Sequence, residues 1–95
     1  MADIDILRSH ALGLDGARAV AAQVGARLAD EFGVTTRWDG DLLRVTGHGV
    51  DGTLDAGAET VRVRAKLGLL ARPFRRALTR EIERELDLVA PLDPS

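Results

Sequence analysis

The stretch that decides the fold is residues 34–67, which read VTTRWDGDLLRVTGHGVDGTLDAGAETVRVRAKL. Three pairs of residues that favour tight turns interrupt it: Asp39-Gly40, Gly47-His48 and Gly57-Ala58. Asp-Gly is among the strongest signals for a two-residue hairpin turn. The segments between these pairs are short and rich in valine, threonine and leucine, which favours strands. The stretch is therefore predicted to form four antiparallel strands joined by hairpins.

The predicted turns also determine which residues pair across the strands. Two-residue turns at these places pair Val34 with Val45, Val45 with Val50, and Leu54 with Val61. Apolar side chains then share one face of the sheet, and a one-residue slip at any turn would mix the two faces. The other face carries a predicted cross-strand row of Arg44, Asp51 and Arg64. Alternating charges of this kind stabilise a sheet modestly.

A strand and a helix are predicted before this stretch. Residues 3–8 alternate between polar and apolar, with Ile4 and Ile6 on one side, as in a half-buried strand. Apolar residues then recur at helical spacing, so we place a helix over residues 15–32 with Asp15 as its N-cap. Gly33 is expected to end this helix in the left-handed conformation.

A long amphipathic helix is predicted after the last strand and runs to about residue 88. Its apolar stripe is spaced at four-residue intervals and consists of Leu70, Phe74, Leu78, Ile82 and Leu86. Pro73 lacks a backbone N–H, so it must lie in the first turn of this helix or kink it.

The elements follow the order β-α-β-β-β-β-α, which predicts the α+β class. If the first strand pairs antiparallel with the fifth, the five-stranded antiparallel sheet has the order 2-3-4-5-1, with two helices on one face. This arrangement is a reduced form of the helix-grip architecture, a comparison at the level of fold alone. We expect one domain over residues 1–90 and a flexible C-terminal tail over residues 91–95, whose prolines bar a continuing helix.

The composition limits the classes of function. The 95 residues carry a net charge of −2 and no cysteine, which excludes disulfides, thiolate metal sites and a cysteine nucleophile. No apolar run reaches the ~18 residues that cross a bilayer, and the acidic residues 1–5 do not resemble a secretory signal. We expect a cytoplasmic protein without transmembrane insertion. The negative total charge and the lack of a helix-turn-helix signal argue against a nucleic-acid partner.

Residues that carry chemistry in enzymes are sparse in this chain. His10 and His48 are the two histidines; both stand in predicted turns or loops, without the spacing of metal ligands. Glu81 and Glu85 lie one helical turn apart, but arginines flank them at helical-neighbour spacing, which is typical of a solvated helix surface. We therefore predict no catalytic residue, no metal site and no cofactor, and expect that the protein is not an enzyme.

Two helix faces are candidate contact surfaces. The first is formed by arginines of the last helix, away from its leucines: Arg72, Arg75, Arg76, Arg80 and Arg84. It is either a solvated face or a site for an anionic or amphipathic partner such as lipid head groups, acyl-CoA phosphates or a protein. The second is a flank of small residues on the first helix that suits close packing in a homodimer: Ala19, Ala22, Ala26 and Ala29.

Several motifs, taken in order, resemble those of a bacterial family. They are the isoleucine-rich first strand, the runs HALGL (10–14), FG (32–33), WDGD (38–41), GVDGTL (49–54), AKLGLL (65–70) and IERELD (82–87). Over roughly residues 4–87 the chain resembles the polyhydroxyalkanoic acid system proteins, also described as polyhydroxyalkanoate granule-region proteins. The resemblance implies a cytoplasmic accessory protein and brings no catalytic residues with it.

Two functions remain as alternatives. The first is a non-enzymatic accessory protein of polyhydroxyalkanoate metabolism, a homodimer that binds the granule surface or a granule protein through an exposed apolar patch. The second is a small binder of hydroxyacyl or fatty-acyl ligands between the sheet and the C-terminal helix, which requires an enclosed cavity of ~300 Å³ or more. The candidate lining of that pocket, or of the core, is Trp38, Leu54, Leu70, Phe74, Leu78 and Ile82. Arg72, Arg75 or Arg76 would meet the charged end of such a ligand.

Overall fold

The three predicted hairpins form, but each turn lies one residue further along the chain than predicted. The computed structural model describes residues 2–89, so the predicted tail over residues 91–95 lies outside the described residues. The hairpins join β2 (Thr35–Asp39), β3 (Leu42–Gly47), β4 (Val50–Ala56) and β5 (Thr60–Leu67). Thr36 pairs with Val45, and Leu54 pairs with Val63. A turn displaced by one residue moves the cross-strand pairs by two, so each side chain keeps its predicted face.

Backbone conformation explains where the turns form. The β3–β4 turn is His48-Gly49, and both residues have positive φ, 51° and 82°, as a type I′ turn requires. In the β2–β3 turn, Gly40 has a φ of 64° and takes the first of the two central positions, followed by Asp41. The predicted Asp39-Gly40 turn had placed this glycine second, which is the source of the displaced register of the β2–β3 hairpin.

The displaced register changes the predicted row of charges on the sheet. Arg44 and Arg64 both pair with Thr53, whereas Asp51 pairs with Lys66. The predicted row of Arg44, Asp51 and Arg64 is therefore wrong, because each of its pairs is offset by two residues along the strands.

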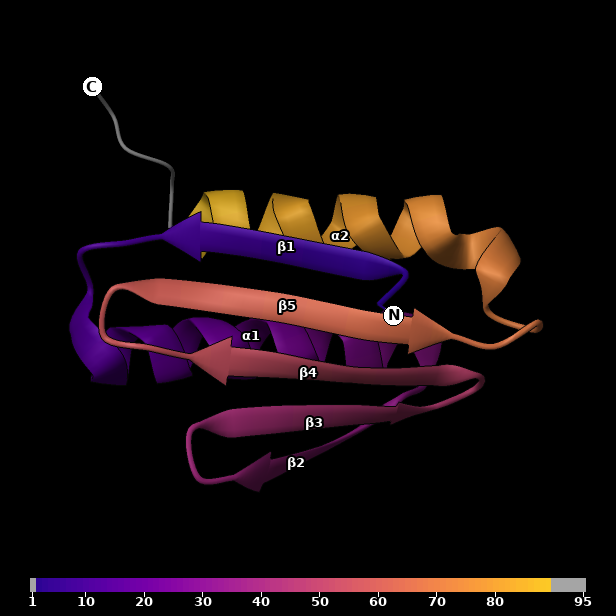
Figure 1. Ribbon diagram of the computed structural model, residues 1–95, viewed down its shortest axis with the longest axis horizontal. Coiled ribbons are helices and arrows are strands. Elements are labelled where there is room, and N and C mark those ends of the chain that lie inside the picture. Colours follow the sequence, from indigo (N-terminus) through magenta and orange to yellow (C-terminus); the bar gives the residue numbers. More distant parts are fainter. Residues whose placement is uncertain (1, 90–95) are drawn as a thin grey trace.

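The first strand, β1 (Ile4–Ser9), completes the sheet by pairing antiparallel with β5, with Ile4 opposite Ala65. The strand order is β1-β5-β4-β3-β2, which confirms the predicted order and the α+β class. Figure 1 shows both helices behind the sheet, on one face of it. Within residues 2–89 no element covers the opposite face, which carries charged residues and threonines.

The first helix, α1 (Gly13–Phe32), begins two residues before its predicted start. Asp15 is not the N-cap: Leu12 holds that position without a side-chain hydrogen bond, and Asp15 lies in the first turn. A negative charge there still interacts favourably with the helix dipole. Gly33 has a φ of 70° and donates its N–H to the carbonyl of Ala29 at 3.0 Å, which confirms the predicted left-handed end.

The last helix begins later than its apolar stripe indicated. A 3₁₀ turn, η1 (Arg72–Phe74), contains Pro73 and leads into α2 (Arg75–Val89). Because proline has no N–H and is tolerated only in the first turn, helical structure begins here and Leu70 stays in the connection. Leu70 is 81% exposed, so its predicted place in the buried stripe is wrong.

The core lies between the inner face of the sheet and the two helices. α1 lies against β2–β5, and α2 lies against β1 and α1. Among the most deeply buried side chains are Val24, Leu54, Val61 and Leu86. Burying a side chain of this size contributes about 1.5–3 kcal/mol relative to leaving it exposed. This packing holds the start of α2 against the end of α1, at the right-hand end of the molecule in Figure 1.

Candidate functional site

Three large apolar side chains are exposed together where β5 leads into α2. Leu69 is 84% exposed, Leu70 is 81% exposed and Phe74 is 54% exposed. The turn between them is held by its own backbone, because the N–H of Ala71 donates to the carbonyl of Gly68 at 3.0 Å. Ala71 itself is buried and anchors the turn, while the two leucines before it stay in solvent. We call Leu69, Leu70 and Phe74 the apolar tip.

A half-open pocket of about 290 Å³ lies beside the apolar tip. Three segments meet there: the last turn of α1, the β3–β4 turn and the start of α2. The lining residues are Glu31, Phe32, His48, Val50, Ala71, Phe74 and Leu78. We call this cavity the end pocket. Phe74 belongs both to its lining and to the apolar tip, so the two features form one continuous apolar surface.

Two polar side chains stand at the end pocket, and both are exposed. The ring of His48 packs against Gly33, where an added Cβ would lie 3.1 Å from Nε2. Glu31 forms an ion pair with Arg27 one helical turn earlier, at 3.2 Å. The pocket is therefore apolar inside and polar where it opens, as small-molecule sites commonly are.

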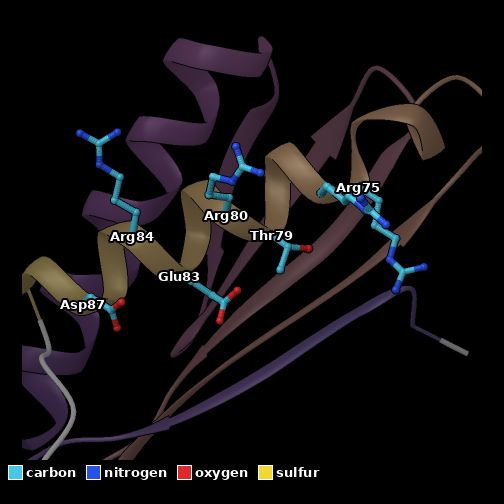
Figure 2. A pocket seen from close by; sticks show the side chains of 7 residues that line it. Arg75, Thr79, Arg80, Glu83, Arg84 and Asp87 are labelled. Carbon is cyan, nitrogen blue, oxygen red and sulfur yellow. The ribbon is translucent and has the colours of Figure 1, made fainter.

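The five predicted arginines share one exposed surface. Arg72, Arg75, Arg76, Arg80 and Arg84 are all exposed, and none forms an ion pair with a carboxylate of residues 2–89. We call these five residues the arginine face. Figure 2 shows an open groove along α2, and Arg75, Arg80 and Arg84 extend from the helix beside it. The groove has a volume of about 680 Å³ and also borders Thr79, Glu83 and Asp87.

Three of the four acidic residues of α2, Glu81, Glu83 and Asp87, are bonded to the rest of the fold. Glu81 accepts a hydrogen bond from Nε of Arg27 on α1 at 3.0 Å, and Arg8 of β1 bonds both Glu83 and Asp87. The hydrogen bond to Glu81, reinforced by the charge of Glu31, raises the pKa of the Arg27 guanidinium above its ordinary value. The predicted solvated surface around Glu81 and Glu85 is therefore wrong, because the side chain of Glu81 is 13% exposed and bonded to α1, and Glu85 is buried.

The six predicted pocket-lining residues do not gather around one cavity. Leu54, Leu78 and Ile82 are buried in the core, where the space between sheet and helices is only about 20 Å³. Trp38 lies on β2, and its ring is covered by Arg18 at 4.3 Å. Leu70 and Phe74 are exposed as described. Of the six, Phe74 and Leu78 line the end pocket, and the others do not, so the predicted set does not form one lining.

His10 takes part in the packing of loops. Its Nδ1 accepts the N–H of Leu12 at 3.1 Å, and its Nε2 lies 3.0 Å from the carbonyl oxygen of Gly57. The imidazole thereby links the β1–α1 connection to the β4–β5 turn. Within residues 2–89, no group of three or more histidine or acidic side chains is placed to hold a metal ion. No helix in this part of the chain is long and apolar enough to span a bilayer.

The alanine flank of α1 is largely open to solvent. Ala19, Ala22 and Ala26 are exposed, and Ala29 is partly buried against the core. The expected homodimer stays a prediction, because a single chain does not test it.

Sequence reasoning missed most of the end pocket. Its walls include Phe32, Val50 and Ala71, which belong to segments far apart in the chain. One local signal was the glycine-rich turn after β3. An added Cβ at Gly49 would lie 3.3 Å from the Cβ of Ala71, so a side chain there would crowd the connection against the pocket.

Comparison with known proteins supports the resemblance drawn from the motifs. The family described as "Putative polyhydroxyalkanoic acid system protein" matches residues 4–89. This span covers both helices and all five strands of the fold. No curated protein and no solved structure matches the chain.

Proposed function

The chain belongs to the family of polyhydroxyalkanoic acid system proteins, and we propose that it is a non-enzymatic accessory protein of that system. In this proposal it acts in the cytoplasm and docks on the surface of a storage-polyester granule, or on a protein of that surface, through its apolar tip. The exposure of Leu69, Leu70 and Phe74 carries the proposal. Neighbouring large apolar side chains in solvent are typical of an interaction site.

The energetics of the apolar tip favour a reversible contact. Burial of each exposed leucine or phenylalanine side chain contributes about 1.5–3 kcal/mol. Association of two bodies costs about 4–15 kcal/mol of lost freedom. Burial of the three side chains of the apolar tip therefore offsets only part of the cost of association, and docking depends on further contacts around the tip. The backbone of the connection is already ordered by the hydrogen bond from Ala71 to Gly68, which lowers the entropy lost on docking.

The surroundings of the histidines support a role without catalysis. His10 is engaged by two backbone groups, and His48 lies in the β3–β4 turn with its ring against Gly33. A general base must be free to reach the proton that it removes from a substrate. The placement of His10 is better explained by loop packing than by such a role.

Fractionation of a polymer-accumulating host tests the granule proposal. The tagged chain is expected to co-sediment with purified granules, and the Leu69→Asp/Leu70→Asp variant is expected to remain in the supernatant. The matched control is Leu12→Asp/Leu14→Asp, which places the same charges on exposed leucines at the other end of the molecule. Acidic residues are favourable at that helix start, so the control should fold well. Equal sedimentation of the tip variant and the wild type would overturn the proposal.

The end pocket supports a second candidate, a small binder of hydroxyacyl or fatty-acyl ligands. Its volume of about 290 Å³ is close to the lower end of small-molecule sites, and most of its lining is apolar. A short acyl chain would lie among Val50, Ala71 and Leu78, with its polar group toward the opening. Titration with short-chain and medium-chain 3-hydroxyacyl thioesters, followed by methyl NMR shifts of these three residues, tests it. Saturable shifts confined to the pocket support the ligand, and unchanged spectra refute it.

A further inference from the structure

The charged side chains of α2 differ in whether they have an ion partner within residues 2–89. Of its four acidic residues, Glu81, Glu83 and Asp87 are engaged by arginines of α1 and β1. The arginine face has no ion pair within residues 2–89, although Arg18, Arg44 and Arg62, on other elements, each have one. Glu83 and Asp87 border the same groove as Arg80 and Arg84, but both are bonded to Arg8, so the arginine face keeps positive charge that has no ion partner within residues 2–89.

The arginines also repel one another. Arg72, Arg76, Arg80 and Arg84 follow at four-residue intervals, so they form one row along η1 and α2. Like charges at this spacing destabilise a helix modestly. The row extends over roughly 18 Å at about 1.5 Å per residue. The row of arginines does not stabilise the fold. Its presence is explained by an anionic partner that contacts these side chains.

The row begins at the apolar tip. Arg72 and Arg75 flank Phe74 in sequence, and Leu69 and Leu70 lie directly before η1. A surface that combines exposed leucines with arginines that have no ion pair within residues 2–89 is complementary to an interface where phosphate groups lie above acyl chains. A nucleic acid would match the arginines but leave the leucines in water, and the net charge of −2 opposes it.

We propose that the arginine face and the apolar tip together bind an anionic phospholipid surface. This inference rests on the proposed function and names the chemistry of the docking partner. The buried side of α2 belongs to the core, so the helix lies on the lipid surface, and only the tip enters the acyl region. The guanidinium groups of Arg76, Arg80 and Arg84 then meet the phosphates. Thr79 adds a hydroxyl group to the groove between them, and the two carboxylates that also border it, Glu83 and Asp87, are bonded to Arg8.

Vesicle flotation tests this inference directly. The purified chain is mixed with vesicles of phosphatidylcholine alone or of phosphatidylcholine with phosphatidylglycerol. Binding is expected only to the vesicles with phosphatidylglycerol and should weaken as salt is raised. Each arginine near an anionic surface contributes about fivefold to partitioning. The Arg76→Glu/Arg80→Glu variant should therefore lose binding by a factor on the order of 25 or more.

A charge-matched variant on the open face of the sheet is the control. Arg37→Glu/Lys66→Glu changes the net charge by the same amount, and both residues are exposed without an ion pair to any described carboxylate. It should bind vesicles within a few-fold of the wild type, and thermal melting establishes that both variants are folded. Equal binding to neutral vesicles, or an Arg76→Glu/Arg80→Glu variant that binds like the control, would overturn the lipid inference.

Granules separate this inference from the proposed function. If the chain binds granules but no vesicle, or binds delipidated granules equally well, the partner is a protein and the lipid inference fails while granule docking stands. If it binds anionic vesicles but no granule, the proposed function fails and the lipid inference stands. If the Leu69→Asp/Leu70→Asp variant binds vesicles like the wild type, the apolar tip has no part in lipid binding. The inference that the arginine face and the apolar tip bind lipid together is then wrong.

Discussion

Arg62 of β5 holds Asp5 of β1 through two parallel hydrogen bonds. Nε donates to Oδ1 at 3.0 Å, and Nη2 donates to Oδ2 at 2.9 Å. Such bidentate pairs combine charge with a defined geometry. The hydrogen bond from Arg62, aided by the charges of Arg62 and Arg64, holds the pKa of the Asp5 carboxyl below its ordinary value of 3.8. The pair joins the first strand to the last.

The Asp5 pair predicts a defined dependence of stability on pH. Folding lowers the pKa of Asp5, so the ionised carboxylate stabilises the folded state. This contribution to the free energy of unfolding is fully present above the unfolded-state pKa of about 3.9 and is lost as pH falls through the folded-state pKa. Asp5→Asn should therefore lower the melting temperature at neutral pH, and the difference from wild type should shrink below about pH 3. Thermal unfolding followed by circular dichroism across this range measures it. A difference that stays constant in acid would contradict this origin.

Arg8 is predicted to fasten the C-terminal part of α2 to β1. Its side chain is only 11% exposed and bonds both Glu83 and Asp87. Because both carboxylates are half exposed, Arg8→Met should lower the free energy of unfolding by only about 1–2 kcal/mol. Glu83→Gln keeps the bond to Asp87 and should have a smaller effect. Urea denaturation compares the three proteins, and an Arg8→Met variant as stable as wild type would refute the role.

Leu86 and Leu70 should respond very differently to truncation. Leu86 is completely buried, whereas Leu70 is 81% exposed. Leu86→Ala should lower the free energy of unfolding by about 2–5 kcal/mol, because it removes contacts and leaves a cavity. Leu70→Ala should stay within about 0.5 kcal/mol of wild type. Chemical denaturation of both variants measures this contrast, and similar losses would mean that Leu70 is packed in solution.

Replacing Gly52, on the inner face of β4, by any larger residue is predicted to lower the stability of the fold. A Cβ there would lie 2.9 Å from the carbonyl oxygen of Arg64 and 3.1 Å from the Cβ of Ala65. Gly52→Val should therefore lower the free energy of unfolding by about 1–3 kcal/mol. Thr53→Val, the next residue on the open face, is the control and should be nearly neutral. A stable Gly52→Val variant would show that β5 moves aside at little cost.

Alternation of polar and apolar residues was enough to predict the strands and the face of each side chain. The turns were misplaced, because the choice between Asp39-Gly40 and Gly40-Asp41 depends on which position needs a positive φ. The paired strands determine which turn position needs a positive φ. Both possible turns consist of residues that favour turns, so the sequence alone does not distinguish them. The face of the sheet on which each side chain lies was still predicted correctly, because the error in register was two residues at each hairpin.

Only the part of the candidate site whose residues recur at a regular spacing in the sequence could be predicted. The arginine face appears in the sequence because its members recur at helical spacing. The apolar tip does not, since Leu70 and Phe74 continue the four-residue spacing of the buried stripe and Pro73 alone interrupts it. The end pocket joins residues near positions 31, 48 and 71, and no local pattern relates segments so distant in the chain.

The pairing of β1 with β5 also has a consequence for synthesis of the chain on the ribosome. The hairpins of β2 to β5 can form one after another as they emerge, but Ile4 has no partner until Ala65 has been made. The first strand to leave the ribosome is therefore the last to be paired, and contacts so distant slow folding. Until then an unpaired edge of β4 or β5 can recruit a strand from another chain. Nascent chains released before β5 is complete should therefore be the aggregation-prone species of this protein.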